Sequence, residues 1–252
     1  MENQQGLVRF RPKLIAIAVA SCFVSGTVLA NPGGHKVVHG NVTVKEVGNL
    51  LKIHNSPNAV INWRSFSIGA NEVTRFVQQS RNSAVMNRVV GSAGNIDPSV
   101  ILGTLKSNGR VYLVNGCGVV FGAGSTVDVA GLVATSLKLS DSDFQANRLR
   151  FTDGAGAGSV VNEGSITGGE VLLVGPAVTN KGIITSPKGD VVLAAGNHVE
   201  LVNPGTPNLR VEITARHGVW VVEDDPYGEL RYRGAPVAPL AADPGADGHV
   251  LH

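Results

Sequence analysis

The stretch Val161-Asn162-Glu163-Gly164-Ser165-Ile166 is echoed by Thr179-Asn180-Lys181-Gly182-Ile183-Ile184, so that equivalent asparagines stand at positions 162 and 180. Each copy is followed by a glycine and an apolar run, Gly169 to Val174 and Gly189 to Ala194. A period of roughly 20 residues suits one coil of a parallel β-helix, in which equivalent residues stack about 4.8 Å apart. Asn side chains can cap the corners, and Gly supplies the positive φ that tight corners need. The echo therefore predicts an all-β, right-handed parallel β-helix.

Short apolar segments separated by Gly, Asn, Ser and Asp extend this pattern from residue 37 to about 215. No long amphipathic helix interrupts them, and the composition agrees, with 32 Gly, 5% aromatic and 16% charged residues. A β-sandwich whose turns resemble each other remains the alternative. The expected strands are Val42–Val47, Arg110–Asn115, Val119–Gly122, Val127–Val129, Val171–Val174, Val191–Ala194 and His198–Val202.

The first 30 residues have the pattern of a secretory signal peptide. A basic region, with Arg9, Arg11 and Lys13, precedes an apolar run, and Val28-Leu29-Ala30 offers a cleavage site after Ala30. A transmembrane anchor and a lipoprotein cleavage site at Cys22 are the alternatives; Ser21 and Ser25 dilute the apolar run that an anchor needs.

The remainder divides into a β-helix domain over residues 31–215 and a tail over residues 216–252. Residues 234–248 of the tail are rich in Pro, Ala, Gly and Asp, which predicts a disordered or truncated segment.

Charge and candidate chemical groups argue against several functions. The whole chain carries a formal charge of +2. The signal peptide accounts for it, so the mature part is nearly neutral and no nucleic-acid partner is expected. Cys117 is the only cysteine after residue 30, which excludes an intramolecular disulfide of the mature chain.

The carboxylates that could serve an enzyme are scattered in sequence. We expect Asp97 to start a turn, Asp128 to face solvent and Asp141 to Asp143 to lie in a loop, rather than to converge in a cleft. The seven His residues show no paired ligand spacing, so no bound metal and no cofactor are expected. The sequence predicts a protein that is not an enzyme; a β-helix enzyme acting on polysaccharide is the alternative.

Several blocks, in order over residues 31–205, resemble the two-partner-secretion domain, the amino-terminal haemagglutination-activity domain of filamentous haemagglutinins and related adhesins. The blocks are Asn31-Pro32-Gly33-Gly34 with Val37-Val38, the segment Ile61-Asn62-Trp63-Arg64-Ser65-Phe66-Ser67-Ile68-Gly69, Phe76-Val77-Gln78, Asn87-Arg88-Val89, Asp97-Pro98-Ser99 to Gly103, Asn108 to Asn115, Gly118 to Gly122, and Val127 to Ser136. Their number and order make the resemblance specific.

The resemblance implies a secreted or cell-surface exoprotein that contributes to adhesion. Its signal domain would be exported through the periplasm, bind the periplasmic domains of an outer-membrane transporter, then fold and template later coils. A host-surface receptor or glycan is a further candidate partner. Three functions thus remain open: a secretion signal, a directly adhesive module and a polysaccharide enzyme.

Residues for transporter recognition and for a β-helix corner follow from the same blocks. They are Asn62, Trp63, Phe66, Asn87, Arg88, Asn115, Gly116, Cys117, Gly118, Phe121 and Gly122. One block departs from the family, which has Asn-Pro-Asn-Gly where this chain has Asn115-Gly116-Cys117-Gly118. Gly116 is expected to loosen a turn that Pro would preset, and Cys117 lacks the side-chain amide of Asn.

Overall fold

The computed structural model describes residues 31–152, 156–187, 189–202, 210–214, 221–222 and 250–251. The predicted signal peptide, residues 1–30, lies outside the described residues. So does nearly all of the predicted tail, apart from the short paired strands β22 (Val221–Val222) and β23 (Val250–Leu251).

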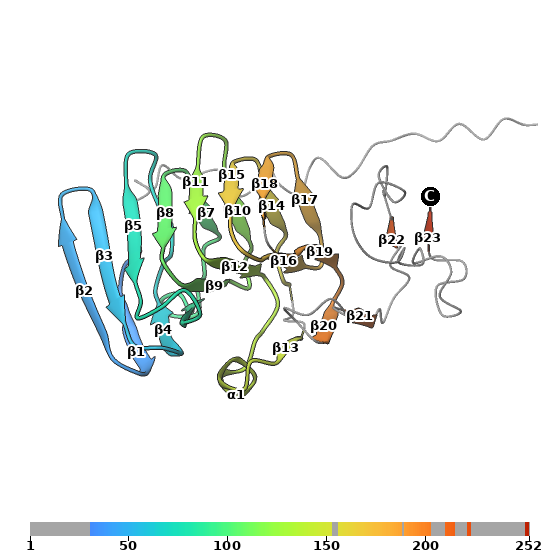
Figure 1. Cartoon of the computed structure of the whole chain (residues 1–252), viewed down its shortest axis with the longest axis horizontal. Coiled ribbons are helices and arrows are strands. Elements are labelled where there is room, and N and C mark those ends of the chain that lie inside the picture. The colour runs from blue at the N-terminus through green and yellow to red at the C-terminus, as the bar shows by residue number, and fades with distance from the viewer. Residues whose placement is uncertain are drawn as a thin grey trace, which may run out of the picture.

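Most described strands belong to three sheets, and the chain winds around one axis as it passes from sheet to sheet (Figure 1). Sheet I contains β1 (Lys36–His39), β4 (Ala59–Trp63), β6 (Ala84–Val89), β9 (Arg110–Val114), β12 (Gly131–Thr135), β16 (Val171–Gly175) and β19 (Val191–Ala195). Sheet II contains β7 (Ser99–Ile101), β10 (Val119–Phe121), β14 (Val160–Asn162) and β17 (Val178–Asn180). Sheet III contains β2 (Val42–Val47), β3 (Leu50–Asn55), β5 (Val73–Val77), β8 (Thr104–Ser107), β11 (Thr126–Asp128), β15 (Ser165–Thr167) and β18 (Ile183–Thr185).

The strand register confirms the predicted parallel β-helix. Asn162 pairs with Asn180 and Ile166 with Ile184 in parallel, so the sequence echo is the stacking of one coil on the next. The chain visits sheets II, III and I in turn, because β7, β8 and β9 are followed by β10, β11 and β12 in the same order. A β-sandwich would pair sequential strands as antiparallel hairpins, and this pattern excludes it for the stacked coils.

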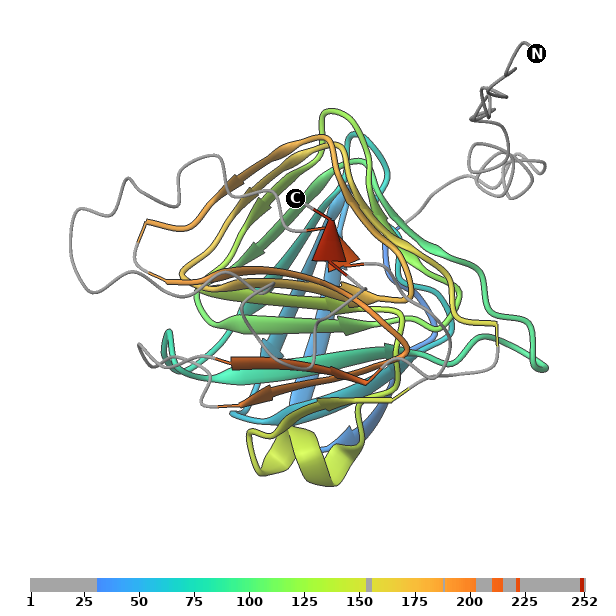
Figure 2. The same ribbon diagram turned by 90° about the vertical axis from the view of Figure 1, so that its right-hand side faces the viewer.

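Figure 2 looks along the stack and shows the strands of the three sheets surrounding one central axis. Inward-facing side chains from all three sheets form the central core. Val111, Leu132, Val171 and similar aliphatic residues occupy successive coils, and each is essentially inaccessible to solvent. These aliphatic ladders account for the many short segments rich in Val, Ile and Leu, because equivalent side chains of successive coils pack on one another.

Strands at the ends of the stack depart from the expected continuous parallel coil over residues 37 to about 215. β1 pairs antiparallel with β4 at the edge of sheet I, and β2 pairs antiparallel with β3 at the edge of sheet III. β20 (His198–Val202), expected as part of a coil, instead lies in an antiparallel sheet between β13 (Leu149–Phe151) and β21 (Arg210–Thr214).

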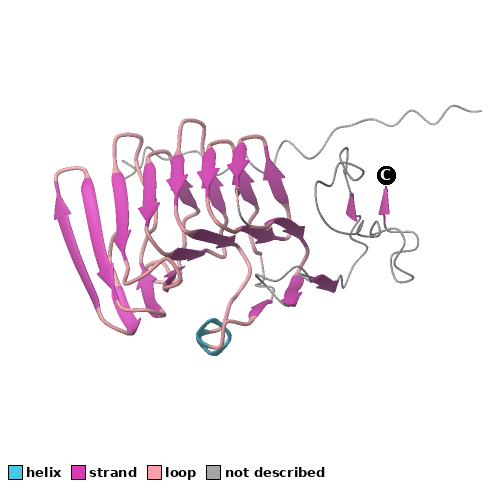
Figure 3. Cartoon of the chain, in the orientation of Figure 1, coloured by secondary structure: helices cyan, strands magenta, loops and turns pink. Residues whose placement is uncertain are grey.

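An insertion between β12 and β14 leaves the coil and covers the outer face of sheet I. It contains β13 and the short helix α1 (Asp141–Gln145), which lies outside the stack (Figure 3). A second buried cluster contains outward-facing residues of sheet I, such as Tyr112 and Leu172, together with Phe144 and Phe151 of the insertion and Val199 of β20. The central strands β9, β12 and β16 of sheet I are therefore buried on both faces, which explains why each of them is a nearly continuous run of apolar residues.

The expectation that Asp141 to Asp143 lie in a loop was wrong. Ser140 caps α1, since its hydroxyl accepts a hydrogen bond from the backbone N–H of Asp143 at 3.0 Å. The Asp143 carboxylate in turn accepts from the Ser140 hydroxyl, which holds the first turn of the helix closed. Asp128, by contrast, is exposed on β11 as expected.

Candidate recognition residues and the family

The recognition residues predicted from the sequence divide into an interior group, a corner and an outer pair. Trp63, Phe66, Asn87 and Phe121 are buried in the interior. Asn115, Gly116, Cys117 and Gly118 form the corner between β9 and β10, and Gly122 follows β10. Asn62 and Arg88 lie next to each other on the outer face of sheet I, in register on β4 and β6.

Trp63 anchors the interior group near the amino-terminal end of the stack. Its indole Nε1–H donates to Asn87 Oδ1 at 2.9 Å, and Asn87 Nδ2 donates to the carbonyl of Tyr112 at 3.2 Å. The Trp63 ring meets Phe66 edge to face at 5.6 Å, and Phe66 stacks on Phe76 at 6.5 Å. These contacts satisfy the buried polar groups and tie three successive strands of sheet I together.

The corner at Asn115 is a closed turn. Gly118 N–H donates to the carbonyl of Asn115 at 2.9 Å, and Asn115 Oδ1 accepts from the backbone N–H of Cys117 at 3.0 Å. Asn115 Nδ2 donates to the Asp97 carbonyl and to Ser99 Oγ, each at 2.9 Å. One buried side chain thus caps its own turn and holds the preceding coil.

The two glycines of this corner have different environments. Gly118 has φ +109°, and a Cβ there would lie 2.8 Å from the carbonyl oxygen of Ser159, so the position requires glycine. A Cβ on Gly116 would meet nothing within 4 Å, and its φ is not in the left-handed region. Gly122, which follows β10, donates its N–H to the Ile101 carbonyl at 2.8 Å.

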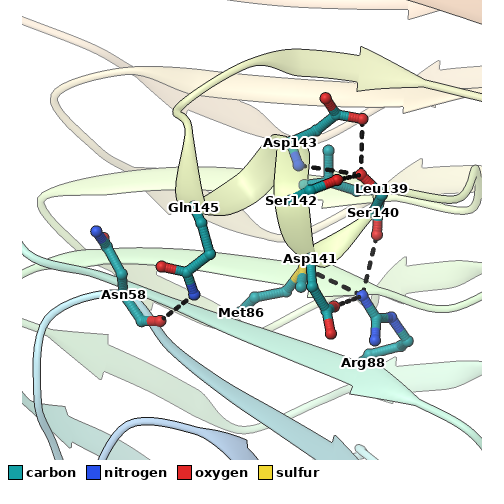
Figure 4. A network of polar contacts seen from close by, with 9 residues as sticks. All are labelled: Asn58, Met86, Arg88, Leu139, Ser140, Asp141, Ser142, Asp143 and Gln145. Carbon is teal, nitrogen blue, oxygen red and sulfur yellow. Dashed lines mark hydrogen bonds and ion pairs between the residues drawn. The ribbon is translucent and has the colours of Figure 1, made fainter.

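Arg88 connects the coil to the insertion (Figure 4). Its guanidinium lies 2.5 Å from Asp141 Oδ1 and donates to the Leu139 carbonyl at 3.0 Å. Gln145 Nε2 at the other end of α1 donates to the Asn58 carbonyl at 2.9 Å. The side chain of Arg88 therefore docks α1 on sheet I rather than standing free for a partner.

Sequence reasoning missed this outer layer, although its signals are present. The pattern Ser140-x-x-Asp143 is the capping arrangement that begins a helix. Alternating Leu149 and Phe151 mark β13, whose buried side chains pack with Phe144. Phe144 meets the Tyr112 ring edge to face at 4.9 Å.

Contacts with this layer shift the pKa values of two acidic groups, the Tyr112 hydroxyl and the Asp143 carboxyl. Burial raises the pKa of the Tyr112 hydroxyl, with Arg110 opposing and Glu170 reinforcing the shift. The Ser140 hydroxyl and the Arg148 guanidinium hold the pKa of Asp143 below its usual value. Both shifts follow from packing, hydrogen bonding and ion pairing within the fold.

The carboxylates considered for catalysis do not converge. On α1, Asp141 pairs with Arg88 and Asp143 pairs with Arg148 at 2.9 Å, whereas Asp128 lies on β11 of sheet III. Within the described residues, no three His, Cys, Asp or Glu side chains are grouped as a metal site would need, and no helix is long and apolar enough to cross a membrane.

The residues singled out from the sequence build the coils and corners of the β-helix. Comparison with known families gives the particular class. The sequence model of the TPS secretion domain matches residues 29–221, and the chain belongs to this family of two-partner-secretion domains. It is a secretion-signal domain, not an enzyme, and proteins of this family are exported through an outer-membrane transporter.

Relatives and solved structures agree with that assignment. A heme/hemopexin-binding protein of Haemophilus influenzae (strain ATCC 51907) is 35% identical over 201 residues, covering 74% of this chain and 22% of that protein. A second Haemophilus influenzae protein of that name is 38% identical over 135 residues, 53% of this chain and 14% of the relative. This chain thus spans less than a quarter of either relative.

The solved structure of the HMW1 secretion domain from Haemophilus influenzae superposes with a TM-score of 0.68 at 34% identity, covering 73% of this chain and 50% of that one. The all-β, parallel β-helical fold expected from the sequence is therefore shared with an experimentally determined secretion domain of the same family.

Proposed function

We propose that residues 31 to about 205 carry the information by which the periplasmic domains of a two-partner-secretion transporter recognise this exoprotein while the chain is still extended. The backbone around Asn62 to Gly69 and Asn108 to Gly122 would add to sheet edges of those domains. The supporting observation is that most side chains of the family blocks are buried once the coils have formed.

Because these side chains are buried in the folded domain, the transporter can contact them only before the coils form. Trp63, Asn87 and Phe121 have no exposed surface, and Asn115 is equally enclosed. A partner that met the folded domain would touch none of them. A partner that meets the extended chain can accept all of them in pockets along a paired strand.

The same argument applies to the backbone. β4 lies between β1 and β6, and β9 lies between β6 and β12, so in the folded domain neither strand has a free edge. Folding and transporter pairing therefore compete for the same N–H and C=O groups. The transporter complex should be transient and should be released as the coils form.

The carboxy-terminal coil offers a template for further coils at the cell surface. β17, β18 and β19 are the last strands of their sheets within the described residues. Val191 and Leu193 on β19 stack on the buried Val171 and Leu173, yet remain about half exposed. The proposal extends to adhesion, for which a host-surface receptor or a glycan would be the partner.

A disulfide that closes one coil in the periplasm tests the requirement for an extended chain. Thr104 on β8 and Thr126 on β11 are directly paired in sheet III and point outward. In a Cys117→Ser background, Thr104→Cys/Thr126→Cys should form a bridge in an oxidising periplasm. Secretion by the cognate transporter should fall and should recover when reductant is added.

The control is Thr104→Cys alone, which places the same new thiol without a bridge and should be secreted normally. Full secretion of the bridged chain, with the bridge shown intact in the secreted material, would contradict recognition of an extended chain. A deletion of residues 31–122 tests the location of the signal; secretion that survives it would end the assignment to these blocks.

A further inference from the structure

The outer face of sheet III carries a single file of basic side chains, which we call the basic column: Lys45, Lys52, Arg75 and Lys106. They come from four successive strands, β2, β3, β5 and β8, and are direct partners in the strand register. Successive strands are about 4.8 Å apart, so the cations follow the long axis of the stack.

Their outward direction follows from their neighbours along each strand. Leu51 and Ile53 on either side of Lys52 are buried in the core, as are Thr74 and Phe76 on either side of Arg75. Because side chains alternate along a strand, the charged residues between them face solvent. Lys45, Arg75 and Lys106 are exposed and Lys52 is half-buried.

Within the part of the chain that the structure describes, no ion pair joins a carboxylate to Lys45, Lys52, Arg75 or Lys106, and only Lys106 has a carboxylate, that of Asp128, as its neighbour in the strand register. The ion pairs found there involve other cations, such as Arg110 with Glu170 at 2.6 Å and Lys181 with Glu163 at 3.3 Å. The next residue in the same register is Asp128 on β11, beside Lys106 at the end of the column.

Like charges placed directly opposite each other on neighbouring strands destabilise a sheet. Lys45 has an independent explanation, since a lysine on an edge strand discourages pairing with another chain. Lys52, Arg75 and Lys106 lie on interior strands of sheet III and gain nothing from that effect. A bound external anion would offset the repulsion between these aligned cations.

We propose that the basic column binds a linear anionic polysaccharide, such as a sulfated glycan, on the folded domain. The cations lie in one row on a flat sheet rather than around a pocket, which matches an extended polyanion with regularly spaced charges. Hydroxyls of Thr43, Thr104 and Thr126 occupy the two flanking rows and can bond to sugar hydroxyls.

Two other polyanions fit less well. Proteins that bind single-stranded nucleic acid combine cations with aromatic platforms for the bases, and the column and its flanking rows contain only one ring, the His54 imidazole. A lipid surface is contacted by a two-dimensional patch of cations with bulky apolar residues inserted beside it, whereas these cations form a single file.

The test measures binding of size-defined heparin to the mature chain by titration calorimetry. Lys52→Gln/Arg75→Gln/Lys106→Gln should weaken binding about tenfold or more, because three charge contacts are lost. The matched control, Arg64→Gln/Lys138→Gln/Lys181→Gln, removes the same net charge from exposed positions elsewhere and should change affinity less than about twofold. Circular dichroism checks that both variants keep the native β signal.

Several results would overturn the proposal. One is equal weakening by the two triple variants, which would reduce the effect to net charge. Another is absence of heparin binding by the native chain at low salt. Duplex DNA or phosphatidylglycerol vesicles bound as tightly as heparin, with the same loss in the column variant, would replace the polysaccharide by those ligands. Neutral dextran should not bind.

Discussion

The two ends of the coil stack differ in how their edges are covered. At the amino-terminal end, the antiparallel strands β1 and β2 cover the edges of sheets I and III, and Asn31 is buried there. Asn31 accepts from Thr74 Oγ1 at 3.0 Å and donates to the Asn49 carbonyl at 3.2 Å. At the other end, within the described residues, β17, β18 and β19 have no strand beyond them.

The difference shows in residues that occupy equivalent positions. Leu173 and Leu193 are register partners and face the same core, yet Leu173 is 0% exposed and Leu193 is 47% exposed. Antiparallel edge strands bend the chain away from further parallel pairing at one end, while a parallel edge invites the next coil at the other. The fold is thus closed in one direction and extendable in the opposite direction.

The largest expected effect comes from breaking this equivalent pair. Leu173→Asp places an unpaired carboxylate in the core and should lower the free energy of unfolding by several kcal/mol, about 4 or more. Ile166→Asp, also fully buried, should behave alike. Leu193→Asp should cost less than about 1 kcal/mol because water reaches the position. Urea titrations give all three values; similar losses at positions 173 and 193 would remove the distinction between covered and open coils.

The closed end depends on its aromatic cluster. Trp63→Ala should lower the free energy of unfolding by about 3–5 kcal/mol. The substitution leaves a large cavity against Phe66 and leaves Asn87 Oδ1 without its hydrogen-bond donor. Trp63→Phe keeps most of the volume and removes only the indole donor, which should cost about 1–3 kcal/mol. Thermal unfolding of the two variants separates packing from the hydrogen bond. A cost below 1 kcal/mol for Trp63→Ala would contradict the role assigned to this cluster.

The stacked asparagines Asn162 and Asn180 compare a covered coil with the last coil through a smaller expected change in stability. Asn162 is buried; its Oδ1 accepts from Gly164 N–H at 3.1 Å and its Nδ2 donates to Asn180 Oδ1 at 2.8 Å. Asn162→Ala should therefore cost about 1–3 kcal/mol, because the Gly164 N–H loses its partner away from water. Asn180→Ala should cost less, about 1 kcal/mol or below, because Asn180 is exposed and water can replace the acceptor that Asn162 Nδ2 loses. A reversed order would show that the last coil is not the less constrained one.

How far the sequence predicts this structure depends on whether a feature repeats. The Asn162 and Asn180 echo identified the coil because stacking places like on like, and the strands from Arg110 to Val129 followed from their glycine corners. The antiparallel strands at the ends have no echo, since each occurs once and pairs according to distant neighbours.

The insertion was missed for a related reason. Its layer becomes visible only when the outward residues of sheet I, such as Tyr112 and Leu172, are known to need a cover. The recognition residues were located in sequence by resemblance, but their burial could not be read from it. Trp63 and Arg88 stand in two blocks of the same resemblance, yet Trp63 faces the core and Arg88 faces the insertion.

The smallest expected effect is at the corner, which belongs to neither end. Gly116 occupies the second position of the Asn115–Gly118 turn, and no described hydrogen bond uses its N–H. Gly116→Pro should raise the free energy of unfolding by about 0.4–1 kcal/mol by restricting the unfolded chain. Gly118→Ala should lower it, because its positive φ and the nearby Ser159 carbonyl exclude a Cβ.

Gly116→Pro/Cys117→Asn restores the family sequence and connects this corner to export. If the native corner slows folding, the double variant should fold faster and be secreted better by the cognate transporter. Equal secretion of the native and double-variant chains would mean that Gly116 and Cys117 do not impair the corner.

Native-state hydrogen exchange tests the difference between the two ends most directly. Amides of β4, β6 and β9, which lie between other strands of sheet I, should exchange only through the largest openings of the molecule. Amides of β18 and β19 should exchange through local openings of clearly lower free energy, with a graded increase in protection toward β12. Uniform protection along the stack, or stronger protection in β19 than in β6, would contradict a stack closed at its amino-terminal end and extendable at the other.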